Sequence, residues 1–327
     1  MPKAVRFHEL GGPEVLKIEE VTLREPGEGE AVMKVAAVGL NRAESMYYHG
    51  RYMEPTQLPS GLGYEVFGTV TAVGPGVDQA LVGQKFGTMP GYSMGRYPSL
   101  AEEAVVPASE LAALPPSLSP VEGAAVWMQY ATAYGALVEL AKVGKGDFVI
   151  ITAASSSVGL AAIQLVKDAG GVAIATTRTS EKRQRLLELG ADYVIASAEE
   201  DLPARVNEIT GGKLARVVFD PVGGPYVDTL AKAVAPEGTI FVYGMLSGEP
   251  TVYPMAQFGK SIILRSYTLL QMKSPGRLEP MKKYIYDRLA DGRFKPEVAK
   301  VFPFAETVEA YQYLESNQQV GKIVITL

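Results

Sequence analysis

The stretch that decides the fold of this chain reads Val149-Ile150-Ile151-Thr152-Ala153-Ala154-Ser155-Ser156-Ser157-Val158-Gly159. It completes an apolar run, Phe148–Thr152, of the kind that forms a parallel strand buried on both faces. It then leads into Val158–Ala169, where apolar residues recur at helical spacing. Between strand and helix lies a tight turn of small residues, so free backbone N–H groups and the helix dipole would face one point and form an anion site.

This turn is a candidate dinucleotide site. In the usual Gly-x-Gly-x-x-Gly pattern three glycines bring the backbone close to a pyrophosphate, and here only the last, Gly159, is kept. The alternative is an ordinary serine-capped turn between a strand and a helix. Because the surrounding strand–helix pattern favours a nucleotide site, we expect the cofactor to contact five consecutive residues: Ser155, Ser156, Ser157, Val158 and Gly159.

Strand and helix patterns alternate on the C-terminal side of this turn. The expected strands are Val172–Thr176, Tyr193–Ile195, Val217–Phe219 and Ile240–Val242, and the expected helices are Glu181–Leu189, Leu202–Thr210 and Tyr226–Val234. Repeated βαβ units imply an open parallel sheet covered by helices. The sequence therefore predicts an α/β protein with a Rossmann-type, doubly wound parallel sheet.

The rest of the chain has a different pattern. Residues 1–110 are β-rich, with short runs broken by glycine and proline: Lys3–Phe7, Ala31–Val38, Gly68–Val73 and Ala104–Val106. Ser119 and Pro120 predict the start of a helix that runs to Met128, and a second helix is expected at about Ala131–Ala141. The segment after residue 260 is too short for a domain, so we expect it to pack onto the N-terminal part.

Composition excludes several classes of protein. The 327 residues are 47% hydrophobic and 20% charged, enough for a full core, and the net charge of −5 argues against a nucleic-acid partner. No apolar run reaches the roughly 18–20 residues that span a bilayer. The N-terminus lacks the apolar core of a signal peptide, so we expect a cytoplasmic protein with no membrane partner. Cysteine is absent and there are only two histidines, so we expect no metal site of the zinc type.

The residues after the second strand bear on the choice of cofactor. About 18 residues beyond Gly159, an NAD site would place an Asp or Glu against the ribose 2′-hydroxyl. This chain instead has Thr176-Thr177-Arg178-Thr179-Ser180, then Lys182. Hydroxyl and guanidinium groups can hold a 2′-phosphate that an acid would repel. The sequence therefore predicts NADPH, with Thr177, Arg178, Ser180 and Lys182 among its contacts. The alternative is the solvated start of a helix.

Several short motifs, spread in order over the whole chain, carry a family resemblance. They are Val38-Gly39-Leu40-Asn41-Arg42, Leu58-Pro59-Ser60-Gly61-Leu62-Gly63-Tyr64-Glu65, Gly68-Thr69-Val70, Val73-Gly74-Pro75-Gly76-Val77, Leu189-Gly190-Ala191-Asp192-Tyr193-Val194, Asp220-Pro221-Val222-Gly223-Gly224 and Gly321-Lys322-Ile323-Val324. Together they resemble the zinc-less quinone oxidoreductase-like branch of the medium-chain dehydrogenase/reductase superfamily. The resemblance implies a discontinuous, β-rich GroES-like catalytic domain at residues 1–122 and 261–327, around a Rossmann dinucleotide-binding domain at residues 123–260. It also implies a homodimer, formed through an edge strand near Ser261–Tyr267.

The resemblance also bears on the chemistry. Zinc-dependent relatives hold their metal with a Cys, a His or acid, and a later Cys, and the matching positions here look like Asn41, Tyr64 and Gln129. None of these side chains is a competent zinc ligand. Without a Lewis acid, NADPH can still reduce an acceptor that carries its own electron sink. The resemblance thus implies a zinc-independent, NADPH-dependent oxidoreductase acting on a small-molecule quinone or an enone.

The family further implies roles for individual residues. Tyr52 matches a tyrosine that related enoyl reductases use to donate a proton or hydrogen bond, although it could be a plain packing residue. Asn41 should lie near the nicotinamide. The other residues expected beside the cofactor are Tyr130, Tyr193, Gly244, Thr268 and Leu269.

Other functions remain open from the sequence. One is an enoyl-thioester (enoyl-CoA) reductase, which would need a basic rim for the CoA phosphate, whereas residues 277–300 offer only scattered Lys and Arg. Another is a non-catalytic NADPH-binding protein. A Gly-x-Ser-x-Gly match around Ser93 is typical of hydrolases, but both histidines precede it, so we do not expect a serine hydrolase.

Overall fold

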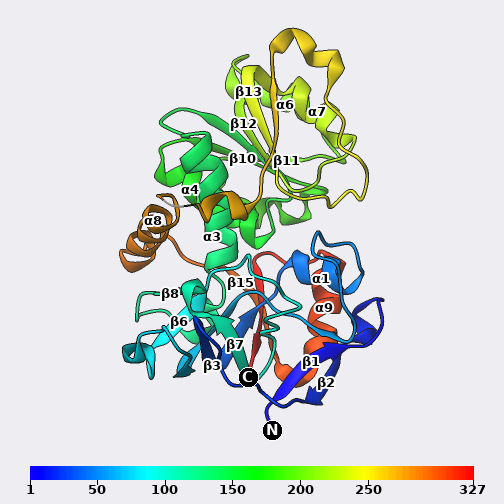
Figure 1. The fold of residues 1–327 in the computed structure, drawn as a ribbon. Helices are drawn as coiled ribbons and strands as arrows, with labels where there is room; N and C mark the ends of the chain where they lie inside the picture. Colours follow the sequence, from blue (N-terminus) through cyan, green and yellow to red (C-terminus); the bar gives the residue numbers. More distant parts are fainter. Residues whose placement is uncertain (275) are drawn as a thin grey trace. The chain divides into compact units, whose positions relative to one another are not determined.

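The structure is a computed structural model that describes residues 1–274 and 276–327 (Figure 1). The chain divides into two compact units. Unit 1 comprises Met1–Met128, Tyr286–Ala290 and Lys295–Leu327, and unit 2 comprises Gln129–Ile285 and Asp291–Phe294. These units reflect compactness alone, so the functional domains expected at residues 1–122 with 261–327 and at 123–260 stay a prediction.

Unit 2 is built on a six-stranded sheet in the order β11-β10-β9-β12-β13-β14, with every neighbouring pair parallel. Its strands are β9 (Phe148–Ile151), β10 (Val172–Thr177), β11 (Tyr193–Ala196), β12 (Ala215–Asp220), β13 (Val234–Val242) and β14 (Ile263–Ser266). Its helices are α4 (Ser157–Asp168), α5 (Arg183–Glu188), α6 (Leu202–Thr210) and α7 (Tyr226–Lys232). Because β10 and β12 flank β9, the strand order reverses there, and the expected doubly wound parallel sheet is confirmed.

The apolar runs of the sequence explain this sheet. Ile150, Ile174, Val218 and Ile240 come from four adjacent strands and are fully buried in one cluster. Strands with helices on both faces have no solvent side, so every position can be apolar. The remaining helices are α3 (Trp127–Tyr134), which continues into a π-helical stretch at Gly135–Leu140, and α8 (Leu278–Ala290).

Three elements differ from the sequence expectation. The helix after Ser119, α2 (Pro120–Gly123), ends before Met128 because Ala124 and Ala125 are buried against Ala37 and Phe67 of the unit 1 sheet. The helix expected at Tyr226–Val234 ends at Lys232, since Val234 already starts β13. The strand near Ser261–Tyr267 is β14, which pairs with β13, so its hydrogen bonds attach it to the unit 2 sheet and not to the N-terminal part.

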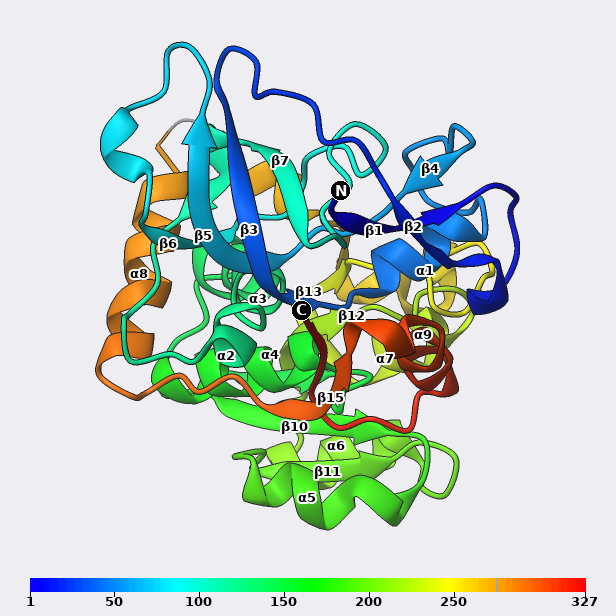
Figure 2. The same cartoon turned by 90° about the horizontal axis from the view of Figure 1, so that it is seen from below.

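Unit 1 contains a three-stranded sheet, β2-β1-β4, and a seven-stranded sheet in the order β15-β16-β3-β5-β6-β8, with β7 also paired to β3 (Figure 2). The strands are β1 (Lys3–Phe7), β2 (Lys17–Glu20), β3 (Glu30–Gly39), β4 (Ser60–Gly61), β5 (Val66–Val73), β6 (Lys85–Thr88), β7 (Glu103–Pro107), β8 (Leu111–Ala112), β15 (Val298–Pro303) and β16 (Lys322–Thr326). Because β16 pairs antiparallel with β3, the C-terminal segment packs onto the N-terminal part, as expected.

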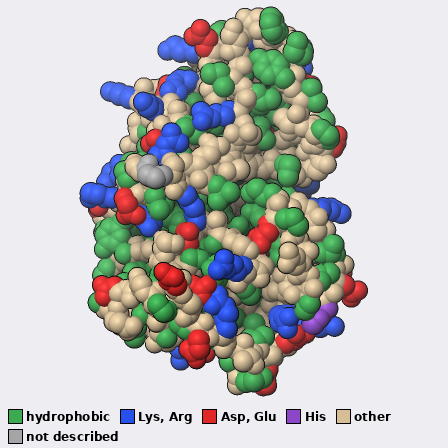
Figure 3. Space-filling view, in the orientation of Figure 1, with side chains coloured by type: hydrophobic (Ala, Val, Ile, Leu, Met, Phe, Trp, Pro, Cys, Tyr) green, Lys and Arg blue, Asp and Glu red, His purple; other side chains and the backbone are tan. Residues whose placement is uncertain are grey.

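Two helices complete unit 1: α1 (Arg42–Tyr48) directly follows β3, and α9 (Thr307–Ser316) precedes β16. Tyr47, Tyr48 and Tyr311 from these helices are fully buried in the core of the unit. Acidic and basic side chains are interspersed on the face that Figure 3 shows. Across residues 1–274 and 276–327, no helix combines the length and apolar character needed to cross a membrane. The cytoplasmic location stays a prediction.

Candidate functional site

The turn after β9 has the geometry of an anion site. Ser156 caps α4, since its hydroxyl accepts a hydrogen bond from the Gly159 amide at 3.1 Å. The first helical backbone bond here runs from Leu160 to Ser156, so the amides of Ser157 and Val158 precede it and have no acceptor within the helix. These amides and the N-terminal end of the helix dipole are the groups that bind phosphate in such turns.

Gly159 is required by close packing. A Cβ at this position would lie 2.6 Å from the Cα of Ala154, and any side chain would push α4 away from the end of β9. Ala153 has a positive φ of 46°, so the turn is tight enough to use the left-handed region without a glycine. The structure therefore brings the five predicted residues of positions 155–159 together at the end of β9.

The carboxyl end of β10 lies beside this turn. Lys182 donates to the Ser155 hydroxyl at 3.3 Å, which joins two segments that the sequence analysis proposed separately. Burial, with the nearby positive charge of Arg178 adding to it, lowers the pKa of Lys182. Arg178 is exposed, and within the described residues its guanidinium has no hydrogen-bond or ion-pair partner. This end of β10 thus presents two cationic side chains next to the turn.

Two further predicted residues have other partners at this end. The backbone amide of Ser180 donates to Glu199 at 3.0 Å, so that amide is already occupied. The carbonyl of Thr177 accepts from the amide and the hydroxyl of Ser197, at 2.8 and 3.2 Å. Ser197 follows directly on β11 and was not among the predicted residues, although its position one residue past a strand would have marked it.

The structure does not bring Tyr193 to this edge. Tyr193 is the first residue of β11, which runs parallel to β10. It therefore lies about 10 Å along the strand from the carboxyl end that faces the turn. Tyr130 also has other partners: its buried ring stacks on Phe294, with centroids 5.0 Å apart, and its hydroxyl donates to Gln164 at 3.0 Å.

Gly244, Thr268 and Leu269 lie just beyond β13 and β14, on the same edge as the turn because the strands are parallel. A Cβ on Gly244 would lie 2.7 Å from the carbonyl oxygen of Pro221, so this position tolerates only glycine. The sequence analysis missed Tyr243, whose ring stacks on Phe219 with centroids 4.0 Å apart. Its hydroxyl lies near Ser156, is buried, and has no hydrogen-bond partner among the described residues.

Unit 1 holds a buried polar cluster around Asn41. The Asn41 carboxamide donates to the Gly39 carbonyl at 3.0 Å and accepts from the Lys322 ammonium at 2.6 Å. Lys322 also pairs with Glu65 at 2.6 Å, and both charged side chains are fully buried. The Glu44 carboxyl group accepts a hydrogen bond from the backbone amide of Asn41 at 2.6 Å. Burial raises the pKa of Glu44 to about 7. The orientation of Asn41 is therefore fixed from three sides.

Tyr52 lies in the same unit, in the segment that follows α1. It is half-buried, and its hydroxyl is 3.2 Å from that of Tyr64. Desolvation raises the pKa of Tyr52, so the group stays protonated at neutral pH. From the sequence, Tyr64 is predicted to occupy a position that holds a metal ligand in zinc-dependent relatives.

The residues at the zinc-equivalent positions do not fit a zinc ion. The Asn41 oxygen already faces the Lys322 ammonium, which would repel a second cation. Tyr64 is a neutral phenol bonded to another phenol. Across the two described ranges, no group of three or more Asp, Glu or His side chains could hold a metal ion.

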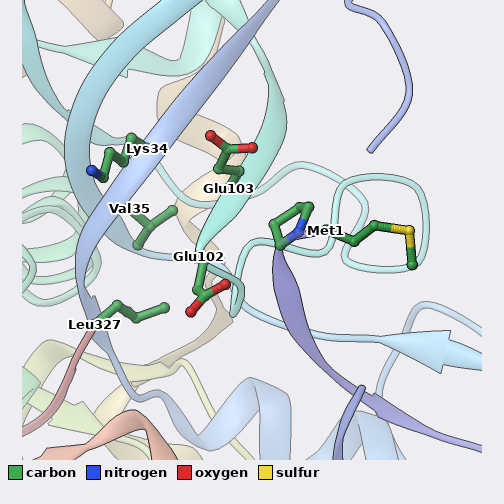
Figure 4. Close-up of a pocket in the computed structure, with 7 residues that line it drawn as sticks. Met1, Lys34, Val35, Glu102, Glu103 and Leu327 are labelled. Atoms are coloured by element: carbon green, nitrogen blue, oxygen red, sulfur yellow. The ribbon is translucent and has the colours of Figure 1, made fainter. Parts of the chain in front are cut away.

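Two other features are not part of this site. A groove on unit 1 is lined by Met1, Pro2, Lys34, Val35, Glu102, Glu103 and Leu327, none of them a predicted site residue (Figure 4). Ser93 lies in the loop between β6 and β7 and donates to Glu54, so it lacks the strand that a hydrolase nucleophile follows.

Comparisons with known proteins agree with this geometry. The profile of the alcohol dehydrogenase GroES-like domain matches residues 27–116, and that of the zinc-binding dehydrogenase family matches residues 157–281. Quinone oxidoreductase 1 of Escherichia coli is 31% identical over 99% of both chains. The 2-haloacrylate reductase of a Burkholderia species is 30% identical over 99% of both chains.

A solved structure extends the similarity to three dimensions. The quinone oxidoreductase of Escherichia coli, crystallised with NADPH, superposes with a TM-score of 0.91 at 30% identity, covering 99% of this chain and 100% of the other. The match includes both the GroES-like and the Rossmann-type parts. This chain belongs to the quinone oxidoreductase-like branch of the medium-chain dehydrogenase/reductase superfamily.

Proposed function

We propose that this protein is an NADPH-dependent, zinc-independent reductase of small molecules, which delivers hydride to a quinone or to an α,β-unsaturated carbonyl compound. The observation that carries the proposal is the anion-binding turn at positions 155–159 with Arg178 and Lys182 beside it. Relatives named as a quinone oxidoreductase and as a 2-haloacrylate reductase support the two acceptor classes.

The residues present fit NADPH. The amides at the start of α4 would hold the pyrophosphate, and Gly159 leaves the room that a close backbone approach needs. Arg178 and Lys182 would hold the 2′-phosphate, where an acidic side chain would repel it. The unpaired Tyr243 hydroxyl near Ser156 is a further donor toward the same ligand.

For catalysis, the protein has to orient the bound acceptor and supply a proton donor. When bound, NADPH supplies a hydride, and the acceptor supplies its own electron sink. Tyr52 keeps its proton at neutral pH and can donate it to the reduced acceptor. Asn41 is held rigidly by Lys322 and Gly39, so it can orient the nicotinamide or the acceptor at little entropic cost.

The first test is cofactor binding followed by turnover. NADPH and NADH are titrated by fluorescence, and a naphthoquinone, an alkyl enone and crotonyl-CoA are then offered as acceptors. We expect tighter binding of NADPH, and oxidation of NADPH with a quinone or an enone. Turnover of crotonyl-CoA alone would show an enoyl-thioester reductase, and binding without any turnover would show a non-catalytic protein.

Replacing Arg178 with Ala should weaken NADPH binding about 10-fold and leave NADH binding unchanged, because one charge-assisted hydrogen bond to the 2′-phosphate is lost. Fluorescence titration of both cofactors measures the effect. The matched control is Arg183→Ala, since the Arg183 guanidinium is already paired with Glu200. Equal losses for NADPH and NADH would show that Arg178 does not face the 2′-phosphate.

Replacing Tyr52 with Phe should lower kcat roughly 10- to 100-fold, with NADPH affinity unchanged, because the reduced acceptor loses its proton donor. Steady-state kinetics and a separate NADPH titration check the two parts. Tyr47→Phe is the control, since it removes another hydroxyl of unit 1, one that is hydrogen-bonded to Ser60 in the core at 3.0 Å. An unchanged kcat in Tyr52→Phe would show that Tyr52 is a packing residue and not the proton donor.

The homodimer is proposed on the free edge of β14. This strand ends the described sheet order, and the segment between β13 and β14, together with Ile263 of β14, carries exposed apolar side chains: Met245, Leu246, Val252, Met255, Phe258 and Ile263. An exposed edge strand close to exposed apolar side chains can pair with the same strand of a second copy of the chain. We expect Phe258→Asp with Ile263→Lys to halve the mass measured by light scattering, while Leu187→Lys, also in unit 2, leaves it unchanged. A monomeric native protein would contradict the proposal.

A further inference from the structure

The phenol of Tyr64 is held firmly against Tyr52. Tyr64 is 6% exposed, and its ring contacts the ring of Tyr92 edge-on, with centroids 5.6 Å apart. Its backbone carbonyl accepts hydrogen bonds from Tyr92 at 2.9 Å and from Thr88 at 3.2 Å. Gly63, with a φ of 115°, sets the direction in which the chain enters this position. The backbone of Tyr64 is therefore held in place, and turning its ring away from Tyr52 would break the edge-on contact with Tyr92.

The surroundings of the two hydroxyls favour one direction of the hydrogen bond between them. Within the described residues, the Tyr64 hydroxyl has one partner, Tyr52, at 3.2 Å. A buried O–H that has one acceptor donates to it, because an unmade bond costs free energy. Tyr52 is half-buried and can use its own proton elsewhere. This arrangement favours Tyr64 as the donor and Tyr52 as the acceptor, which leaves the Tyr52 proton available.

We propose that Tyr64 is a positioning residue for the reduction, which orients the Tyr52 hydroxyl and stabilises its oxygen as the proton leaves. The inference rests on the proposed function, in which Tyr52 is the proton donor. Hydride addition leaves an anion on the acceptor. The Tyr52 O–H bond then breaks, its proton goes to that anion, and the electron pair stays on the Tyr52 oxygen. The hydrogen bond from Tyr64 strengthens as this oxygen becomes negative, and solvent returns a proton to Tyr52 afterwards.

The electrostatics of the pair agree with this direction. Desolvation is the main cause of the raised pKa of Tyr52, and the hydrogen bond from Tyr64 opposes it. The carboxylates of Glu54 and Glu44 act in the raising direction on Tyr52. Burial, with the neighbouring Tyr52 adding to it, raises the pKa of Tyr64, so Tyr64 stays protonated at neutral pH. The two phenols are chemically alike, so the proposed difference between proton donor and positioning residue comes from their surroundings.

The experiment places a fluorinated tyrosine, which titrates at lower pH than tyrosine, at position 52 and follows its ionisation by fluorine NMR without cofactor. The same label is placed in the Tyr64→Phe and Tyr47→Phe variants. We expect the midpoint to rise by about one pH unit in Tyr64→Phe and to stay unchanged in Tyr47→Phe, because only the first loses a hydrogen bond to the ionised oxygen. In unlabelled protein, kcat should fall about 10-fold in Tyr64→Phe with NADPH affinity unchanged.

The outcomes separate this inference from the proposed function. An unchanged midpoint in Tyr64→Phe overturns the inference, whatever the kinetics show. A raised midpoint with an unchanged kcat also overturns it, since the hydrogen bond would then exist without serving the reaction. If Tyr52→Phe itself keeps full turnover, the proton-donor role in the proposed function fails, while the titration still reports the hydrogen bond. A raised midpoint together with a lowered kcat supports the inference.

Discussion

Replacing Lys322 with Met should destabilise unit 1 by about 3–5 kcal/mol, a large share of the stability of an ordinary domain. Lys322 is the cation of a fully buried ion pair with Glu65, at 2.6 Å. Met has a similar length and would fill most of the same space, so the expected loss comes from charge and not from a cavity. Glu65 would be left as a buried carboxylate without a countercharge.

The neighbouring groups cannot replace the lost ammonium. Glu65 keeps a hydrogen bond from the Met128 amide at 2.9 Å and a longer one from Asn41 at 3.4 Å. Both donors are neutral, so they solvate the carboxylate without cancelling its charge. The Asn41 oxygen also loses its partner at 2.6 Å. We therefore expect a loss of order in the Asn41 side chain together with the loss of stability.

The protein contains a convenient reporter for this measurement. Its single tryptophan, Trp127, lies in unit 1 and is buried, so urea unfolding followed by tryptophan fluorescence reports on that unit. Arg6→Met is the control in the same unit, because Arg6 pairs with Glu19 at 3.7 Å at the protein surface. Such surface pairs contribute about 0–1 kcal/mol.

A second substitution separates charge from packing. Adding Glu65→Gln to Lys322→Met removes the unpaired charge, and it should restore at least half of the lost free energy of unfolding. A Lys322→Met variant that is destabilised by less than about 1 kcal/mol would contradict the idea that this pair holds the cluster together.

The parts of the site that the sequence could predict are those made by local chain geometry. A strand, a turn and a helix fix the position of Ser156 relative to Gly159, three residues apart, whatever the rest of the chain does. The position of Arg178 at the carboxyl end of β10 could be predicted for the same reason, since it is the residue directly after that strand. The alternating strand and helix patterns likewise gave the parallel sheet, because apolar strands need cover on both faces.

The parts that escaped prediction depend on distant contacts or on exact register. Lys322 meets Asn41 and Glu65 across 281 and 257 residues, and no local pattern marks that meeting. A lysine at the start of the apolar strand β16 was one available signal. Tyr193 is predicted beside the cofactor from a motif. It is the first residue of β11, whereas Ser197 directly follows the last one. A shift of four residues along a strand moves a side chain from one edge of the sheet to the other.

The second large effect concerns Glu44, whose replacement by Gln should change how stability depends on pH. Glu44 is fully buried, and burial is the main reason that its pKa is raised from 4.5 to about 7. One of its oxygens accepts from the Asn41 amide, while the other has no hydrogen-bond partner among the described residues. The neutral acid is therefore the form that fits the folded protein.

The sign of the effect follows from proton binding. Between about pH 4.5 and about pH 7 the folded protein keeps the Glu44 proton and the unfolded chain has lost it, so folding takes up a proton. The stabilising contribution is fully present below about pH 4.5 and is lost as the pH rises to about 7. A difference of about 2.5 pKa units corresponds to roughly 3 kcal/mol over this window.

Glu44→Gln removes this titration and keeps an acceptor for the Asn41 amide. The free energy of unfolding of the native protein, read from Trp127, should therefore fall by roughly 2.5 kcal/mol more than that of Glu44→Gln between about pH 5 and about pH 8. Glu122→Gln is the control, since Glu122 forms an exposed capping box with Ser119 in the same unit. Parallel pH profiles for the native protein and Glu44→Gln would show that Glu44 is ionised in the fold. Lys322 would then have to neutralise both Glu65 and Glu44, and the Lys322→Met variant would lose more stability than a single broken pair explains.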